Sequence, residues 1–456
     1  MALVSIQPFD GKKIRDYEEM DGAQVDRILA DSARVFAEWR KQTFDERAGP
    51  MRAAAALLLR RKAELAELMA REMGKPLKQG WAEIEKCAKG CEFYAQRAAD
   101  FLRPEPAATE ARRSYVSFEP LGTVLAVMPW NYPFWQVFRF AAPALMAGNA
   151  AVLKHASNVS GCALAIEAIL AEAGFPAGLF RTLLLSSAKV AGVIRHPAVK
   201  AVTLTGSNRA GEEVAAEAGR NLKKTVLELG GSDPFLVLAD ADLEKAVAVA
   251  TESRLLNAGQ SCISAKRFIV VPEIREAFEA AFVAKMAAAK PGDPLSEKTE
   301  LGPLARPDLR ATLQKQVDAS VKQGARLLLG GKIPEGPGAY YPPTVLSGVQ
   351  PGMPAYEDEI FGPVAAVLHA ENEEDAIRLA NDTSYGLGAA VFTRDLERGE
   401  RIARDRLEAG SCFVNALVRS DPRLPFGGVK ASGYGRELSA FGIREFVNIK
   451  TVYVAE

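Results

Sequence analysis

The chain has 456 residues, of which 48% are hydrophobic and 25% are charged, a balance typical of a globular protein with two or three domains. The 57 basic and 57 acidic residues cancel, so nucleic acid and anionic membranes are not favoured and a small molecule is the expected partner. No apolar run approaches the ~18 residues of a membrane span and no apolar leader opens the chain, which predicts a cytoplasmic protein.

The first part of the chain has the periodicity of helices. Apolar residues recur at i, i+3 and i+4 within residues 22–73, which predicts helices there. Cys87 and Cys91 lie four residues apart in the next segment, on one face of a helix. With five cysteines, an odd number, and no histidines at zinc-ligand spacing, the sequence predicts neither a disulfide framework nor a metal site.

Two segments far apart in the chain alternate apolar and polar residues, which is typical of strands. They are residues 109–120, TEARRSYVSFEP, and the C-terminal tail, REFVNIKTVYVAE. Such strands can pair with each other or with those of another subunit.

From residue 123 onward, short apolar runs alternate with helical segments. The runs TVLAVM, NAAVLK, FRTLLL and KAVTLT are separated by segments such as GCALAIEAILAEAG. A second series, from RFIVV to LERGERIARDRL, follows residue 262. This alternation predicts parallel sheets built of βαβ units, so the expected fold class is α/β.

The run TVLAVM leads into a turn in which Pro129 and Pro133 hold the backbone rigid around Asn131. A rigidly presented amide suits an oxyanion donor, whereas Trp130 is explained equally by core packing. The largely apolar helix that follows contains Arg139, which needs a counter-anion, either a structural acid or a ligand.

The run KAVTLT ends at Gly206 and Ser207, directly before a helix. The free N–H groups and the positive dipole end of that helix can bind a phosphate. The full GxGxxG fingerprint of dinucleotide-binding proteins is absent, so a plain βα turn explains the pattern as well.

Glu228 ends the next apolar run, just before Gly230 and Gly231. A buried carboxyl at this place would have a raised pKa and could act as a general base. A solvated glutamate at a strand end has the same pattern.

Cys262 lies in NAGQSCISAKR among small and polar neighbours, where core packing requires no thiol. Cys162, in GCALAIEAIL, has instead the neighbours of an inert core cysteine. The environment of Cys262 therefore calls for an explanation from the rest of the chain.

Several motifs together resemble the aldehyde dehydrogenase superfamily. They are PWNYP, GNAAVLKHAS, TGS, LELGG, NAGQSC, EIFGPV and PFGGVKASGYGRE, in the family's order and over nearly the whole chain. The spacing of 34 residues from Glu228 to Cys262 is the most specific of these features. Through KHASN, LELGGSDPF and YYPPTVL, the chain is most similar to short bacterial-type succinate-semialdehyde dehydrogenases.

The resemblance implies a division into three parts and a homodimer or homotetramer. These are a Rossmann-like NAD(P)-binding domain in residues 1–108 and 120–229, an α/β catalytic domain in residues 230–435, and an oligomerisation arm of strands in residues 109–119 and 436–456.

The resemblance also implies the chemistry. Cys262 is the nucleophile, a role that requires access and small neighbours. The oxyanion that forms on the aldehyde when Cys262 attacks is held by the Asn131 amide and the Cys262 backbone N–H. A hydride passes to the nicotinamide, and Glu228 activates the water that hydrolyses the resulting thioester. The residues that match cofactor-binding positions are Pro129, Trp130, Lys154, Ser157, Gly206, Ser207, Leu229, Glu359 and Phe361.

Cofactor choice follows from Ser157, three residues after Lys154. Family members strict for NAD commonly carry a glutamate there, which repels a 2′-phosphate, whereas a serine can donate to it and Lys154 can neutralise it. The sequence therefore predicts NADP, with NAD possible.

The predicted substrate is succinate semialdehyde. Its distal carboxylate needs a cation beyond the nucleophile, for which Arg139 is the candidate and Arg419 the rival. Trp135 would wall the aliphatic spacer, and Ser261 and Ser420 would add hydroxyl donors.

Three alternatives stay open on the sequence alone. A CoA-acylating relative would not use a glutamate at the position of Glu228, and a catalytically silent structural homologue would not need Cys262, Glu228 and Asn131 together. Another substrate, such as an aminoaldehyde or an aromatic aldehyde, is compatible with the motifs.

Overall fold

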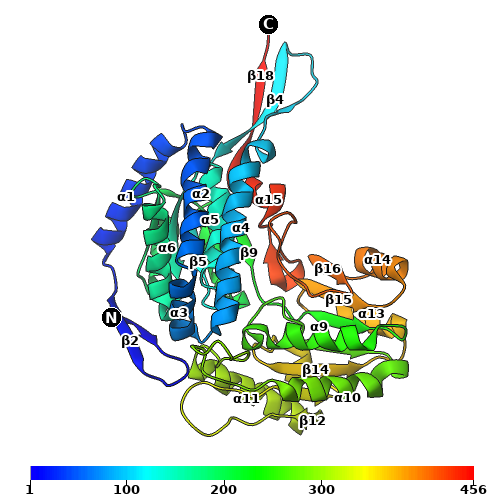
Figure 1. Cartoon of the computed structure of the whole chain (residues 1–456). Helices are drawn as coiled ribbons and strands as arrows, with labels where there is room; N and C mark the ends of the chain where they lie inside the picture. The colour runs from blue at the N-terminus through cyan, green and yellow to red at the C-terminus, as the bar shows by residue number, and fades with distance from the viewer. Residues whose placement is uncertain (1) are drawn as a thin grey trace.

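Residues 2–456, which the computed structural model describes, form two large sheets covered by helices and a projecting antiparallel arm (Figure 1). A hairpin of β1 (Ala2–Ile6) and β2 (Lys13–Glu18) precedes them. In this part of the chain, no helix combines the length and the apolar character needed to cross a membrane. The predicted α/β class is confirmed.

Four helices follow the hairpin, and the first three lie within residues 22–73, where the periodicity predicts helices. They are α1 (Gly22–Trp39), α2 (Phe44–Arg60), α3 (Lys62–Met73) and α4 (Leu77–Phe101). At the start of α1, Asp21 and Gln24 each accept the other's backbone N–H, which fixes the first turn. Gly74 ends α3 with φ of 79°, in the left-handed region that favours glycine.

The first large sheet has the strand order β17-β9-β8-β5-β6-β7. Its strands are β5 (Thr123–Met128), β6 (Ala150–His155), β7 (Phe180–Thr182), β8 (Val199–Thr205), β9 (Lys224–Glu228) and β17 (Gly433–Tyr434). Strands β5 to β9 pair in parallel, and the short β17 pairs antiparallel with β9 at one edge.

Helices cover both faces of this sheet. They include η1 (Ser157–Val159), η2 (Ser187–Lys189), α5 (Trp135–Met146), α6 (Ser160–Glu172), α7 (Val190–Arg195) and α8 (Asn208–Arg220). One hydrophobic core joins the sheet to α2, α4, α5 and α6, and a second joins its other face to α1, α7 and α8.

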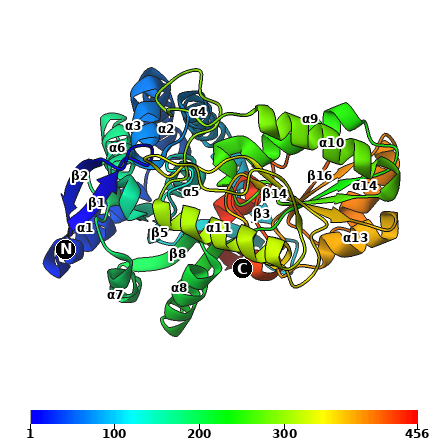
Figure 2. The same cartoon turned by 90° about the horizontal axis from the view of Figure 1, so that it is seen from below.

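The second large sheet has the order β12-β13-β14-β11-β10-β15-β16, parallel except for β12. Its strands are β10 (Pro234–Val237), β11 (Arg267–Val270), β12 (Arg326–Leu329), β13 (Thr344–Ser347), β14 (Val364–His369), β15 (Gly388–Phe392) and β16 (Ser411–Val414). The helices of this region are α9 (Leu243–Leu255), η3 (Leu256–Gly259), α10 (Pro272–Ala288), α11 (Pro307–Lys322), α12 (Pro354–Glu357), α13 (Glu373–Asn381) and α14 (Leu396–Asp405). Figure 2 shows α9 and α10 on one side of the sheet and α11 and α13 on the other.

The arm consists of β3 (Glu105–Pro106), β4 (Arg113–Pro120) and β18 (Val447–Val454). Strand β18 follows η4 (Lys430–Ser432) and α15 (Ser439–Arg444) and returns to pair antiparallel with β4. Of the two pairings that the sequence allowed, the one within the chain is therefore confirmed. In Figure 1 the arm projects from the body of the molecule, with the C-terminus at its tip.

The fold gathers the predicted site residues at one edge of the first sheet. Parallel strands place their carboxyl ends together, and each of four adjacent strands, β9, β8, β5 and β6, ends beside a predicted site segment. The loop with Cys262 comes from the other side, between α9 and β11 of the second sheet. The first sheet takes β5–β9 from residues 123–228 and the second takes its strands from residues 234–414, while the domain boundaries proposed above stay predictions.

Candidate active site

The segment before Cys262 has a strained backbone. Asn257 and Gly259 have positive φ values of 53° and 71°. At Gly259 an added Cβ would lie 2.1 Å from the carbonyl oxygen of Gly362, so the position requires glycine. The Asn257 Nδ2 donates to the carbonyl oxygen of Asn131 at 2.8 Å, which ties this loop to the turn after β5.

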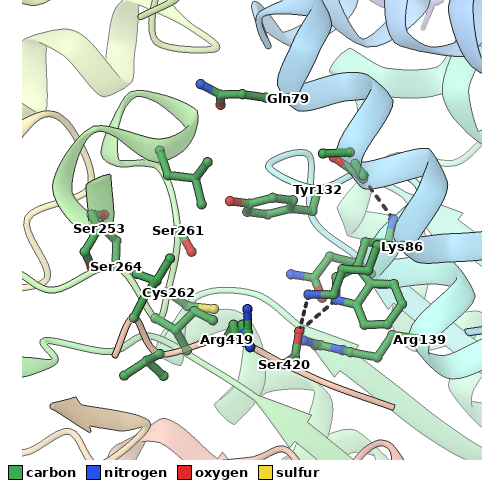
Figure 3. Close-up of a pocket in the computed structure, with 18 of the residues that line it drawn as sticks. Gln79, Lys86, Tyr132, Arg139, Ser253, Ser261, Cys262, Ser264, Arg419 and Ser420 are labelled. Carbon is green, nitrogen blue, oxygen red and sulfur yellow. Dashed lines mark hydrogen bonds between the residues drawn. The ribbon is translucent and has the colours of Figure 1, made fainter. Parts of the chain in front are cut away.

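Cys262 lies at a cavity of about 310 Å³, and its sulfur points into it (Figure 3). One face of α4, the start of α5, residues 253–264 and residues 417–426 form the wall. The wall is mostly apolar, but it includes the cationic residues Lys78, Lys86, Arg139 and Arg419. The predicted substrate residues Trp135, Ser261 and Ser420 also line it.

Two hydrogen-bond donors are positioned at the nucleophile. Asn131 Nδ2 donates to the carbonyl oxygen of Gln260 at 3.2 Å, two residues before Cys262. Within residues 2–456, the backbone N–H of Cys262 donates to no acceptor, and the second N–H of the Asn131 amide is likewise unused. Both groups can therefore donate to an oxyanion that forms at the thiol.

A buried ion pair supports the turn that carries Asn131. Lys75 and Glu83 are in contact, and Lys75 Nζ also donates to the carbonyl oxygen of Asn131 at 2.9 Å. Glu83 accepts the backbone N–H groups of Phe134 and Trp135, each at 2.9 Å, where α5 begins. Sequence reasoning missed this pair, because both residues lie more than 45 positions before the turn that they hold.

Glu228, the last residue of β9, is a buried carboxylate. It is 2% exposed, and within the described residues neither of its oxygens has a hydrogen-bond partner. Burial raises the pKa of its carboxyl to about 8; Arg139, with Nη2 at 3.8 Å, opposes the rise. Of the two interpretations of the sequence, the solvated glutamate is wrong, and the buried environment suits a general base.

The pKa of the Cys262 thiol is also raised by burial, to about 12. The positive charge of Arg139 lowers it, and the negative charge of Glu228 raises it further. Lys266 Nζ donates to the carbonyl oxygens of Ser261 and Cys262 at 2.9 and 2.7 Å, which fixes the backbone on either side of the thiol. The resting nucleophile is therefore a thiol that must lose its proton before it attacks.

Arg139 lines the cavity but already has an acidic partner. Its guanidinium is in contact with Glu437, and both residues are almost completely buried. Nη2 also donates to Thr205 Oγ1 at 3.2 Å, and the guanidinium lies over the Phe426 ring. Of the two counter-anions that the sequence left open, the structural acid is present in Glu437, and the role of Arg139 toward a substrate stays a prediction.

Ser420 joins Trp135 to a residue that sequence reasoning missed, Lys86. Ser420 Oγ accepts from Lys86 Nζ at 2.8 Å and from Trp135 Nε1 at 3.1 Å. The Lys86 ammonium also lies 4.4 Å from the Trp135 ring centroid. Its only sequence signal is a stripe on α4 at residues 78, 79, 82, 83 and 86, which share one helical face.

The predicted cofactor residues form a continuous row along the strand ends. Pro129 and Trp130 follow β5, Lys154 and Ser157 lie at the end of β6, Gly206 and Ser207 follow β8, and Leu229 follows β9. Across from this row, the Glu359 carboxylate accepts the backbone N–H of Gly231 at 3.1 Å, and Phe361 packs edge to face on Trp130 with ring centroids 5.8 Å apart.

These residues fit a nicotinamide dinucleotide. Lys154 Nζ has no hydrogen bond or ion pair with residues 2–456. Partial burial lowers its pKa, because the charged ammonium is less stable away from water, and an anionic partner such as a phosphate would stabilise it. The exposed Ser157 hydroxyl lies three residues further on. Ser207 is the N-cap of α8; its Oγ accepts the Ala210 N–H, and the other N–H groups of the first turn favour a phosphate. Among the described residues, leaving aside its two chain neighbours, only Leu204 comes within 4 Å of a Cβ added at Gly206.

The model of the aldehyde dehydrogenase family matches residues 2–452. The chain belongs to the aldehyde dehydrogenase family. A succinate-semialdehyde dehydrogenase (NADP(+)) of Mycobacterium tuberculosis is 49% identical over 458 residues and covers 100% of both chains. A protein of Synechocystis sp. named as a probable enzyme of the same kind is 48% identical over 455 residues, again with 100% of both chains covered. The crystal structure of succinic semialdehyde dehydrogenase from Streptococcus pyogenes in complex with NADP+ matches with a TM-score of 0.97 and 38% identity, over 99% of this chain and 100% of that one.

Membership of the aldehyde dehydrogenase family establishes the reaction class, the oxidation of an aldehyde with a nicotinamide cofactor. The residue types that this chemistry needs lie around one cavity and one row of strand ends. Glu228 beside the cavity is what hydrolysis of a thioester requires, whereas transfer to CoA does not require it.

Proposed function

We propose that this aldehyde dehydrogenase oxidises succinate semialdehyde to succinate with NADP. The observation that carries the proposal is the cationic and hydroxyl-bearing part of the cavity into which the Cys262 sulfur points. Arg139, Ser261 and Ser420 line that part, and such groups bind a carboxylate. The names of the relatives from M. tuberculosis and S. pyogenes support the same substrate.

The cavity argues against the two other substrate classes. An aminoaldehyde would bring a further positive charge to a wall in which the Lys86 ammonium has no carboxylate partner among the described residues. An aromatic aldehyde has no carboxylate to pair with the Lys86 ammonium, which lies over the Trp135 ring in this wall.

In the acylation half of the reaction, the Cys262 thiol releases its proton to solvent in the cavity, and the thiolate attacks the aldehyde carbon. A C–S bond forms, and the carbonyl electron pair moves to oxygen, where the Asn131 amide and the Cys262 N–H donate hydrogen bonds. A bound nicotinamide supplies the acceptor for the hydride that leaves the substrate carbon. As the hydride leaves, the electron pair on oxygen re-forms the C=O bond, and the acyl group remains on Cys262 as a thioester.

In the deacylation half, Glu228 takes a proton from a water molecule that attacks the thioester carbon. The C–S bond breaks and the electron pair returns to the Cys262 sulfur. Glu228 suits this step because its raised pKa makes it a stronger base than an exposed carboxylate.

For the cofactor, Lys154 and Ser157 are proposed to bind the 2′-phosphate of NADP. The partnerless ammonium and the exposed hydroxyl support this assignment, as do the NADP(+) enzymes among the relatives. NAD, which lacks the phosphate, would keep the other contacts and bind more weakly.

The arm is proposed to join subunits of a homodimer or homotetramer in the cytoplasm. Ile449 and Tyr453 of β18 are 62% and 50% exposed, which is unfavourable for apolar side chains on a projecting strand pair. Contact with a second copy would bury them.

A panel of aldehydes tests the proposal. Succinate semialdehyde and butanal have the same chain length and differ in the distal carboxylate, and each is assayed with NADP and NAD by NADPH or NADH absorbance. The proposal requires a kcat/KM at least tenfold higher for the semialdehyde, and higher with NADP than with NAD. Equal values for the two aldehydes would overturn the substrate assignment.

A further inference from the structure

Lys86 differs from the other three cations of the cavity. Lys78 and Arg419 are exposed, and Arg139 is held by Glu437. Lys86 is partly buried, and in the described part of the chain no carboxylate lies within 4 Å of its ammonium. A sequestered ammonium without an anion is costly, so the site has the charge to take one.

The two carboxylates whose charges act on Lys86, those of Glu83 and Asp421, are already paired with other cations. Glu83, three residues earlier on α4, is in contact with Lys75, and Asp421 pairs with Arg423 at 2.7 Å. Neither carboxylate is free to neutralise the ammonium.

Ser420, beside Lys86, adds a hydrogen-bond donor to the same part of the cavity wall. Its Oγ accepts from both Lys86 and Trp135, which uses its two lone pairs. Its own O–H is therefore left to donate to a further acceptor. An ammonium and a hydroxyl side by side at the cavity wall match the two oxygens of a carboxylate.

We propose that Lys86, with Ser420, binds the distal carboxylate of the substrate and determines the preference for carboxylate-bearing aldehydes. The inference rests on the proposed oxidation of succinate semialdehyde, and it names the residue whose positive charge binds the far end of that substrate. Arg139, whose charge is matched by Glu437, contributes to the field of the site while Lys86 provides the unpaired charge.

The charges around Lys86 predict a pH dependence of substrate binding. Burial and then the positive charge of Arg139 lower the pKa of Lys86 to about 8, and Cys87, Glu83 and Asp421 oppose this weakly. A bound carboxylate favours the protonated ammonium and so raises that pKa. The KM for succinate semialdehyde therefore increases as the pH rises above about 8, while the KM for butanal does not follow it.

The test compares Lys86→Met with Lys86→Arg and with the control Lys89→Met, an exposed lysine three residues later on α4 that does not line the cavity. Methionine keeps the length of the side chain and removes its charge, while arginine keeps the charge at all working pH values. In Lys86→Met the KM for succinate semialdehyde should rise roughly 10- to 100-fold, as for the loss of a hydrogen bond to a charged group, and the KM for butanal should change less than about threefold. Lys89→Met, which removes an exposed and screened charge outside the cavity, should change both values less than about threefold.

The arginine variant keeps the test decisive if the methionine variant is poorly folded. Lys86→Arg should retain most of the preference for the semialdehyde and lose the rise in KM above about pH 8. A wild-type enzyme without preference for the semialdehyde would refute the proposed function. A wild-type preference that survives in Lys86→Met, or an equal rise in KM for both aldehydes, would refute the role of Lys86 and leave the proposed function intact.

Discussion

Replacement of Glu228 by glutamine should separate the two halves of the reaction. Glutamine keeps the shape of the side chain but cannot accept a proton from water, so deacylation loses a general base worth about 10²- to 10⁴-fold. Acylation should survive, because the negative charge of Glu228 raises the pKa of the Cys262 thiol and its removal eases formation of the thiolate. We expect a burst of one NADPH per active site, followed by a kcat lowered about 100- to 10,000-fold.

The pH dependence of deacylation in the native enzyme tests the same role of Glu228. Only the deprotonated form of Glu228 acts as a base, and burial places its pKa at about 8. A carboxyl with that pKa is about one-tenth ionised at pH 7 and about nine-tenths ionised at pH 9, so the deacylation rate should rise about tenfold between them. Stopped-flow measurement of NADPH absorbance resolves the burst from the steady state. Loss of the burst in Glu228→Gln would mean that Glu228 acts before the thioester forms, and a flat native profile would contradict its role as the base.

Three further substitutions address the nucleophile, the cofactor and the buried ion pair. Cys262→Ala should abolish turnover and leave NADP affinity, measured by calorimetry, within about twofold, because the thiol bonds to substrate and not to nucleotide; measurable turnover would contradict the assignment. Ser157→Glu should lower kcat/KM for NADP about tenfold or more and for NAD much less, because a carboxylate repels the 2′-phosphate; equal effects would place cofactor choice elsewhere. Arg139→Ala should lower the free energy of unfolding in urea by about 3–5 kcal/mol, because Glu437 is left buried without its cation, and an unchanged value would show that the pair adds nothing to stability.

Residues next to strand ends were within reach of sequence reasoning. Glu228 ends β9 and Asn131 follows β5, and parallel pairing alone places such positions at one edge of a sheet. The helix that starts near Trp135 was likewise expected from its apolar residues, and the pairing of β4 with β18 was one of the two pairings that the sequence allowed. Here a local pattern and a general rule of sheet geometry were enough.

Contacts between side chains that meet only through tertiary packing could not be predicted from the sequence. Lys86 and Ser420 are 334 residues apart, and Arg139 meets Glu437 only because the chain returns after the second sheet to the edge of the first. A lysine on an amphipathic helix has the pattern of a solvated residue, and nothing near Lys86 in the sequence indicates that its neighbours enclose it. The balance of charges in the cavity therefore could not be predicted without the fold.

The most direct measurement of the central claim is peptide mass spectrometry of Glu228→Gln after incubation with succinate semialdehyde and NADP. If Cys262 carries the acyl group and Glu228 promotes its hydrolysis, one succinyl group should accumulate on the peptide that contains Cys262, in an amount equal to the NADPH burst. Formation of NADPH without that adduct, or a succinyl group on another cysteine, would contradict the account.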